Sequence, residues 1–132
     1  LARSSTVATC LPLTAFVLRE PYADARGMID SGCAVALASD LNPGSCYSQS
    51  IPLIFALAVL YMRLSVDEAL CALTLNGAAA LGLAGEVGSL EPGKRGDLVI
   101  LDAPSRAFLA YHSGMNLVKA TVIGGRLEYE RP

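Results

Sequence analysis

The sequence lacks a long hydrophobic run, a cluster of basic residues and a leader-like N-terminus. Its longest apolar stretch, residues 51–62, has 12 residues, whereas a membrane-spanning helix needs about 20. The net charge is −2 and the basic residues are scattered, so no surface for nucleic acid is expected. No basic start followed by an apolar core precedes the domain, as a signal peptide would require. These absences predict a cytoplasmic protein that binds neither membranes nor nucleic acid.

The sequence also lacks the paired cysteine spacing of a zinc ribbon or a redox motif. Its four cysteines are Cys10, Cys33, Cys46 and Cys71, and none forms a CxxC pair. We interpret them as reduced, mostly buried thiols of a cytosolic protein. A nucleophilic role for Cys46 is disfavoured, because its one candidate partner, His112, is far away in the sequence.

Apolar residues, in contrast, are abundant. They make up 53% of the sequence, and only 17% of residues are charged. This balance exceeds that of an average soluble domain. It predicts either a sheet buried under helices or a piece of a larger protein whose missing part covers apolar surface.

The first part of the chain has the pattern of a βαβ unit. Residues 6–12 read as a strand that stops at Pro12, and residues 21–32 read as a short helix that begins near Pro21. Residues 33–39 form a continuous apolar run of strand length, as expected for a strand covered on both faces. The two strands are therefore predicted to be parallel.

Two further helices are predicted before the chain changes character. Residues 51–64 are apolar nearly all round, which indicates a buried helix. Ser65 and Glu68 have the spacing of a capping box and open a second helix, predicted to run to about Leu81 and to end at Gly82.

After residue 84 the pattern becomes that of a small β segment. Turn residues lead into a strand at 97–102, and residues 117–130 read as a hairpin around Gly124-Gly125. We therefore divide the chain into residues 1–84, an α/β part, and residues 85–132, a β part.

Several polar residues in these elements receive structural interpretations. Thr74 and Asn76 lie on a predicted helix and are expected to bind neighbouring backbone. Asp97 is expected to pair with Lys94 or Arg95 rather than to act in catalysis.

The most suggestive polar segment directly follows the second predicted strand. Asp40, Asn42, Gly44 and Ser45 lie where ligands bind in parallel α/β folds, beyond the carboxyl ends of the strands. A carboxylate there can coordinate a metal ion or accept a proton. The alternative is an ordinary turn, since Asp, Asn, Pro and Gly are common loop residues.

A resemblance extends over nearly the whole chain and favours the first interpretation. The sequence resembles imidazolonepropionases, a family of the amidohydrolase superfamily, in ALASDLNPGS (36–45), LTLNGAAALGL (73–83), VGSLEPGKRGDLVILD (87–102) and YHSGMN (111–116). The segment 36–45 resembles the end of the eighth barrel strand. One departure is Gly96, where the superfamily usually has Ala, a difference expected to affect packing and not chemistry.

The resemblance implies the fold and the reaction. The superfamily fold is a distorted (β/α)8 barrel with a β-sandwich made from both chain ends. Residues 1–84 would supply the last two barrel strands with their helices, and residues 85–132 the C-terminal strands of the sandwich. The implied reaction is hydrolysis of the cyclic amide of 4-imidazolone-5-propanoate to N-formimino-L-glutamate in histidine degradation, with one Zn²⁺ or Fe³⁺.

The resemblance also implies residue roles. Asp40 matches the aspartate metal ligand that takes part in catalysis, while Asn42, Gly44 and Ser45 match positions that contact the small-molecule substrate. The remaining ligands and catalytic groups of the family lie upstream, and the single histidine, His112, is outside those motifs. Because the chain also begins at Leu1, we expect a C-terminal fragment that is inactive and metal-free by itself.

Two other functions remain open from the sequence. One is a related deaminase acting on a nucleobase-like ring. The other is a non-catalytic α/β interaction module, in which the apolar excess would form a partner surface. For a cut barrel, the exposed strands or helices predict a homo-oligomer. A well-behaved monomer would instead favour the interaction module.

Overall fold

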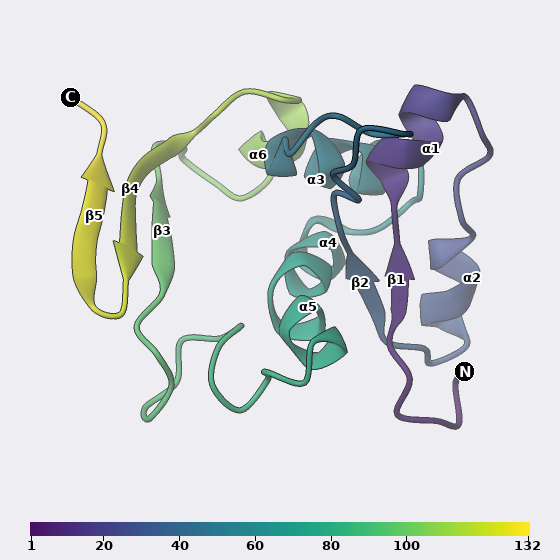
Figure 1. Ribbon diagram of the computed structural model, residues 1–132, viewed down its shortest axis with the longest axis horizontal. Coiled ribbons are helices and arrows are strands. Elements are labelled where there is room, and N and C mark those ends of the chain that lie inside the picture. The colour runs from purple at the N-terminus through teal and green to yellow at the C-terminus, as the bar shows by residue number, and fades with distance from the viewer.

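The computed structural model describes residues 1–132 and begins with a parallel strand pair. Strands β1 (Ala8–Cys10) and β2 (Val35–Leu37) pair in the register Ala8 with Val35 through Cys10 with Leu37. Helices α1 (Pro12–Leu18) and α2 (Ala25–Asp30) form the connection between them (Figure 1). The predicted parallel βαβ unit is confirmed, with shorter strands than expected.

Helix α1 was not predicted, because Pro12 was interpreted as the end of a strand. Pro12 instead occupies the first turn of the helix, where its missing N–H needs no partner. Helix α2 in turn begins four residues later than the predicted start at Pro21. Its N-cap is Asp24, whose side chain accepts a hydrogen bond from the Gly27 amide at 2.9 Å.

Helix α3 (Ile51–Leu60) forms the centre of the core, as its apolar sequence predicts. Its buried residues run from Ile54 to Ala58, and Ser50 caps its N-terminus by accepting from the Leu53 amide. The helix ends at Leu60 rather than at residue 64. Met62 and Leu64 nevertheless remain buried in the same core, in the short segment that leads to the next helix.

The predicted helix from Ser65 to Leu81 is in fact two helices, α4 (Val66–Leu73) and α5 (Leu75–Ala80). The capping box of Ser65 and Glu68 is confirmed. The break lies at Thr74, whose hydroxyl donates to the Leu70 carbonyl at 2.8 Å and whose backbone leaves the helical region. A side chain that binds the preceding turn in this way favours a bend.

The two structural interpretations of Thr74 and Asn76 are confirmed. Thr74 binds backbone in its own helix, and Asn76 donates from Nδ2 to the Val35 carbonyl at 2.8 Å, which ties α5 to β2. The bend at Thr74 thus accompanies a change of direction that brings Asn76 to the strand.

The C-terminal part is a three-stranded antiparallel sheet in the order β3 (Leu98–Leu101), β4 (Val118–Ile123), β5 (Arg126–Glu130). The predicted hairpin is confirmed, and Gly124 and Gly125 form its turn with φ of 58° and 78°, as a two-residue turn of this hand requires.

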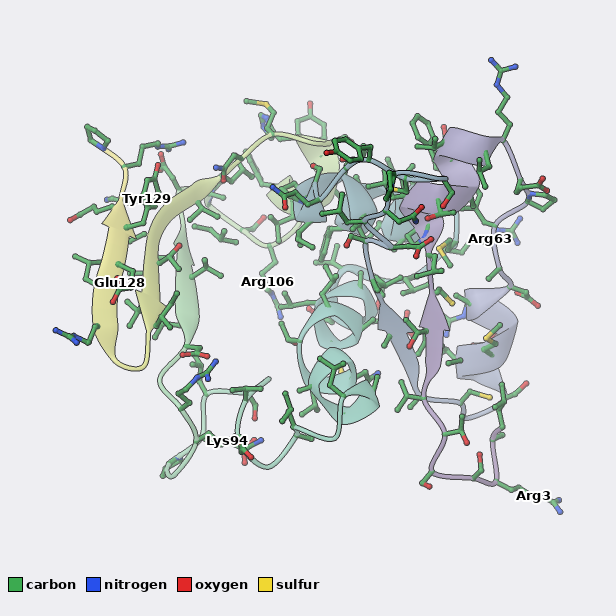
Figure 2. All side chains as sticks on the ribbon, in the orientation of Figure 1. Arg3, Arg63, Lys94, Arg106, Glu128 and Tyr129 are labelled. Atoms are coloured by element: carbon green, nitrogen blue, oxygen red, sulfur yellow. The ribbon has the colours of Figure 1, made fainter.

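The sheet stands apart from the helices, and Figure 1 shows β5 at the outer edge of the molecule. Every residue of β5 is exposed, and the side chains of Glu128 and Tyr129 extend from it in Figure 2. A short helix that was not predicted, α6 (Phe108–Tyr111), connects β3 to β4 and packs against α3. Of the residues after 84, only Ala110 belongs to the buried core cluster.

The domain boundary at residue 84 stays a prediction. Gly96 lies at a packing contact, because its carbonyl accepts from the Gly125 amide at 2.8 Å and a Cβ there would lie 3.2 Å from that amide nitrogen. None of the helices has both the length and the apolar character needed to cross a membrane.

Candidate functional site: the loop after the second strand

Asp40 lies just beyond the carboxyl end of β2, where the sequence predicts a ligand site. Its backbone φ is 50°, in the left-handed region that non-glycine residues seldom adopt. The residue is half-buried. A carboxylate at this depth needs a polar partner, because partial burial weakens its hydration.

That partner is Thr14 on α1. The Thr14 hydroxyl donates to Asp40 Oδ2 at 3.0 Å, and both residues are half-buried. The other carboxylate oxygen, Oδ1, accepts no hydrogen bond within the chain. Sequence reasoning did not identify Thr14. The sequence signal that could have identified it is a hydroxyl residue just after the first strand. The carboxyl ends of parallel strands meet at one edge of the sheet, which brings such a residue close to Asp40.

Asn42 organises the rest of the loop. Its Oδ1 accepts from the Gly44 amide at 2.8 Å and from the Ser45 amide at 2.9 Å. Its Nδ2 donates to the Asp40 carbonyl at 2.7 Å and to Ser45 Oγ at 2.9 Å. Backbone pairing between Asn42 and Cys46 closes the loop.

The structure therefore brings all four predicted residues, Asp40, Asn42, Gly44 and Ser45, into one loop. In this loop the Gly44 and Ser45 amides bind Asn42, so a substrate could use them only by replacing or sharing those bonds. The Ser45 hydroxyl also bonds to Asn42. Their roles as substrate contacts stay a prediction.

The chain alone offers one ligand for a metal ion. Asp40 fits that role through its free Oδ1, but no group of three or more His, Cys, Asp or Glu side chains is placed to hold a metal. A catalytic zinc site has about three protein ligands. His112 is at the end of α6, where its ring stacks on Phe108 with centroids 4.9 Å apart.

The thiol nearest the loop has no activating neighbour. Cys46 is buried, and its Sγ lies 3.7 Å from the Ser48 carbonyl. All four cysteines are free, with Cys10 and Cys46 fully buried. Burial raises the pKa of the Cys10 thiol, which disfavours the reactive thiolate.

Asp97 has a structural environment. It forms an ion pair with Arg95, one of the two predicted partners, and accepts from the Gly124 amide at 2.8 Å. These contacts, that of Arg95 first, hold the pKa of Asp97 below its usual range. The other predicted partner, Lys94, pairs with Glu91 at 3.2 Å.

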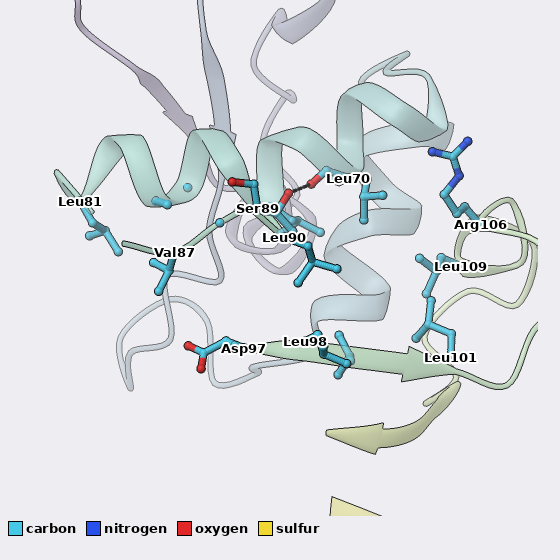
Figure 3. Close-up of a pocket in the computed structure, with 16 residues that line it drawn as sticks. Leu70, Leu81, Val87, Ser89, Leu90, Asp97, Leu98, Leu101, Arg106 and Leu109 are labelled. Carbon is cyan, nitrogen blue, oxygen red and sulfur yellow. Dashed lines mark hydrogen bonds between the residues drawn. The ribbon is translucent and has the colours of Figure 1, made fainter. Parts of the chain in front are cut away.

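An apolar cleft of the molecule lies away from the Asp40 loop. It has a volume of about 660 Å³ between β3, the helices α4 and α5, and the connection that follows them. Its walls are mostly apolar, and Leu90 and Leu98 point into it (Figure 3). No residue of the Asp40 loop lines this cleft, so the cleft and the predicted site are separate features of the molecule.

Comparison with known proteins identifies the family. A sequence model described as "Amidohydrolase family" matches residues 1–127. The imidazolonepropionase of Porphyromonas gingivalis is 67% identical over 129 residues, which are 98% of this chain and 30% of that protein. The imidazolonepropionase of Clostridium tetani is 53% identical over 131 residues, 99% of this chain and 31% of that protein. The chain therefore spans about a third of the length of these curated relatives.

Solved structures have the same fold. An adenosine deaminase of Xanthomonas campestris with bound zinc superposes with a TM-score of 0.82 at 24% identity, over 92% of this chain and 31% of that one. Guanine deaminase of E. coli superposes with a TM-score of 0.79 at 20% identity, over 100% of this chain and 36% of that one. The mixed α/β structure is thus part of a (β/α)8 barrel fold. Because the family model matches residues 1–127, the chain belongs to the amidohydrolase family.

Proposed function

We propose that the chain is the C-terminal part of an imidazolonepropionase. The observation that carries this proposal is the identity to imidazolonepropionases, 53–67% over almost the whole chain. The full protein would hydrolyse the cyclic amide of 4-imidazolone-5-propanoate to N-formimino-L-glutamate. We place it in the cytoplasm, with a small molecule as its substrate.

In this proposal the loop after β2 supplies one side of the active site. Asp40 would be one ligand of a Zn²⁺ or Fe³⁺ ion, and the remaining ligands would come from the longer protein. When bound, such an ion supplies Lewis acidity that activates water. The free oxygen of Asp40, Oδ1, would accept and return a proton, because it carries no hydrogen bond within the chain.

Asn42, Gly44 and Ser45 would contact the substrate. The loop gathers an amide, two backbone N–H groups and a hydroxyl in one short segment, and a ring amide that both donates and accepts would share or replace the bonds these groups make to one another. Their mutual hydrogen bonds give the loop a defined shape before the substrate arrives, which lowers the cost of ordering it.

The test uses the longest reading frame that contains the chain. Purified protein from that frame should hydrolyse 4-imidazolone-5-propanoate and contain about one equivalent of metal, while residues 1–132 alone should do neither. Asp40→Asn should abolish activity. The matched control is Asp102→Asn, since Asp102 is an exposed carboxylate paired with Arg131 on the β segment, and it should retain activity.

Other outcomes would contradict the proposal. Deamination of adenosine or guanine in place of imidazolonepropanoate hydrolysis would favour the deaminase alternative. A reading frame no longer than this chain would favour an interaction module. So would a stable, inactive monomer that binds another protein.

A further inference from the structure

The contact between Thr14 and Asp40 crosses two elements that are distant in sequence. Thr14 lies in the first turn of α1, after β1, and Asp40 lies in the loop after β2. The Thr14 hydroxyl donates to Asp40 Oδ2 at 3.0 Å, and both residues are half-buried. Threonine in a helix often bonds instead to the carbonyl three or four residues earlier. Thr14 makes no such bond, so its hydroxyl serves Asp40 alone.

The main chain of Asp40 is held separately. Asn42 donates to the Asp40 carbonyl at 2.7 Å, next to a backbone whose φ of 50° costs an L-residue about 1 kcal/mol or more. Asn42 therefore fixes the backbone position of Asp40, but it makes no hydrogen bond to the Asp40 carboxylate. The rotation of that group about χ2 has a broad energy minimum in aspartate. Within this chain, the Thr14 hydroxyl is the only group that hydrogen-bonds to the carboxylate.

We infer that Thr14 is a positioning residue for Asp40. By occupying Oδ2, it fixes the orientation of the carboxylate and leaves Oδ1, which accepts no hydrogen bond within the chain, for a ligand. Groups that orient a metal ligand in this way usually contribute 10- to 100-fold to metal affinity or activity. The inference rests on the proposed function, because it assumes that Asp40 is a metal ligand and a proton acceptor.

The experiment compares three variants in the full-length protein that contains this chain. Thr14→Val removes the hydroxyl at nearly constant volume, and Thr14→Ser keeps it. Thr121→Val is the matched control, because Thr121 is half-buried like Thr14, lies on β4 of the C-terminal sheet and makes no hydrogen bond through its hydroxyl. The readouts are kcat, KM, the rate of metal release to a chelator and the visible spectrum of the Co²⁺-substituted protein.

The expected result separates positioning from folding. Thr14→Val should lower kcat and speed metal release by roughly 10-fold each, with KM within about twofold and a shifted Co²⁺ spectrum. Thr14→Ser should restore both values to within about threefold of wild type, and Thr121→Val should match wild type. Circular dichroism checks that each variant is folded. If Thr14→Val does not fold, Thr14→Ala replaces it in the same comparison.

The outcomes that overturn the inference are distinct from those that overturn the proposed function. Unchanged metal release and unchanged spectrum in a folded variant without the hydroxyl would exclude the positioning role. A Thr14→Ser protein as defective as Thr14→Val would do the same. A wild-type protein that binds metal but leaves imidazolonepropanoate intact would refute the function alone, and metal release would still decide the role of Thr14. A wild-type protein that binds no metal would refute both.

Discussion

Asn42 makes more side-chain hydrogen bonds than any other residue of the candidate site. Its amide bonds to Asp40, Gly44 and Ser45 within one short loop. Asn42→Ala should therefore loosen the loop, reduce kcat by more than about 10-fold and lower the free energy of unfolding by roughly 1–3 kcal/mol. Steady-state kinetics and urea unfolding of the full-length protein measure both effects.

The matched control for this prediction is Asn116→Ala. Asn116 accepts one side-chain hydrogen bond, from the Val118 amide, in an exposed turn of the β segment. It should retain full activity. If the two alanine variants had the same kcat, the loop would not depend on Asn42.

Glu68 makes the folding stability of the protein depend on pH. Arg26 makes a bidentate pair with it at 2.8 and 2.9 Å, and this pair, helped by the Ser65 amide, lowers the pKa of Glu68 from 4.5 to about 2. Its stabilising contribution is therefore present above pH 4.5 and is lost as the pH falls toward 2. Screening by solvent limits it to roughly 1 kcal/mol, because the side chain is 31% exposed.

The measurement is urea unfolding at pH 6 and pH 3. Glu68→Gln should destabilise the protein at pH 6 and have a smaller effect at pH 3, where the wild-type contribution is already reduced. Glu128→Gln on the exposed strand β5 is the control, since Glu128 has no ion pair. An equal loss at both values of pH would contradict the assignment to this carboxylate.

At the residue scale, the sequence predicted positions better than roles. The position of Asp40 at the end of a strand could be predicted, because an apolar run precedes it and turn residues follow it. The assignment of Asn42 as loop organiser does not follow, because its partners depend on how the chain folds back on itself. Thr14 was missed for the same reason: its partner is Asp40, on another element.

Among the elements, the connection after α5 is held against the helix by a close contact at Gly88. A Cβ on Gly88 would lie 2.7 Å from that of Ala78 and 3.0 Å from the Thr74 carbonyl oxygen, and its φ is +95°. Gly88→Ala should therefore cost roughly 2–4 kcal/mol in unfolding free energy, from backbone strain and from overpacking. Urea unfolding midpoints measure this cost.

Gly85→Ala tests whether the effect is local. Gly85 lies in the same connection, has nothing within 4 Å of an added Cβ and has no left-handed backbone. Its substitution should change stability by less than about 0.5 kcal/mol. A comparable loss in both variants would mean that the contact with α5 is not the cause.

Element prediction succeeded where the signal is local and failed where it is not. The capping box at Ser65 and the Gly124-Gly125 turn are encoded by adjacent residues, and both are confirmed. The short helix α6 depends on contacts with α3, which no local pattern reports. The direction of α5 after the break at Thr74 likewise depends on the bond from Asn76 to β2. Pro12 was misread because proline both stops a strand and starts a helix.

The molecule as a whole exposes strand edges and apolar side chains. The β1–β2 pair has two open edges, and β3 and β5 expose Val99, Ile100, Leu127 and Tyr129. We predict that residues 1–132 alone self-associate through these surfaces. Size-exclusion chromatography with light scattering should show a molar mass that rises with protein concentration when the concentration is varied about a hundredfold. A constant monomer mass would contradict this prediction.

At the scale of the whole molecule, the sequence predicted the fold class but not how the parts of the molecule pack together. The apolar excess predicted a covered sheet or a partial domain, and the superposition on part of larger barrel structures agrees with it. The sequence predicted a separate β part after residue 84, but not how that part packs against the helical core. That packing depends on the connection after α5 and on the docking of α6 against α3, which are tertiary contacts.

The order of strand pairing has a consequence for the route by which the chain folds. Each strand bonds to a neighbour along the sequence: β1 to β2, then β3 to β4 and β4 to β5. Pairing strands that follow one another in the chain costs less loop-closure entropy than pairing distant strands, and topologies rich in such local pairings fold fast. We therefore expect native structure to accumulate from the N-terminal side during synthesis on the ribosome, with the hairpin of β4 and β5 added last.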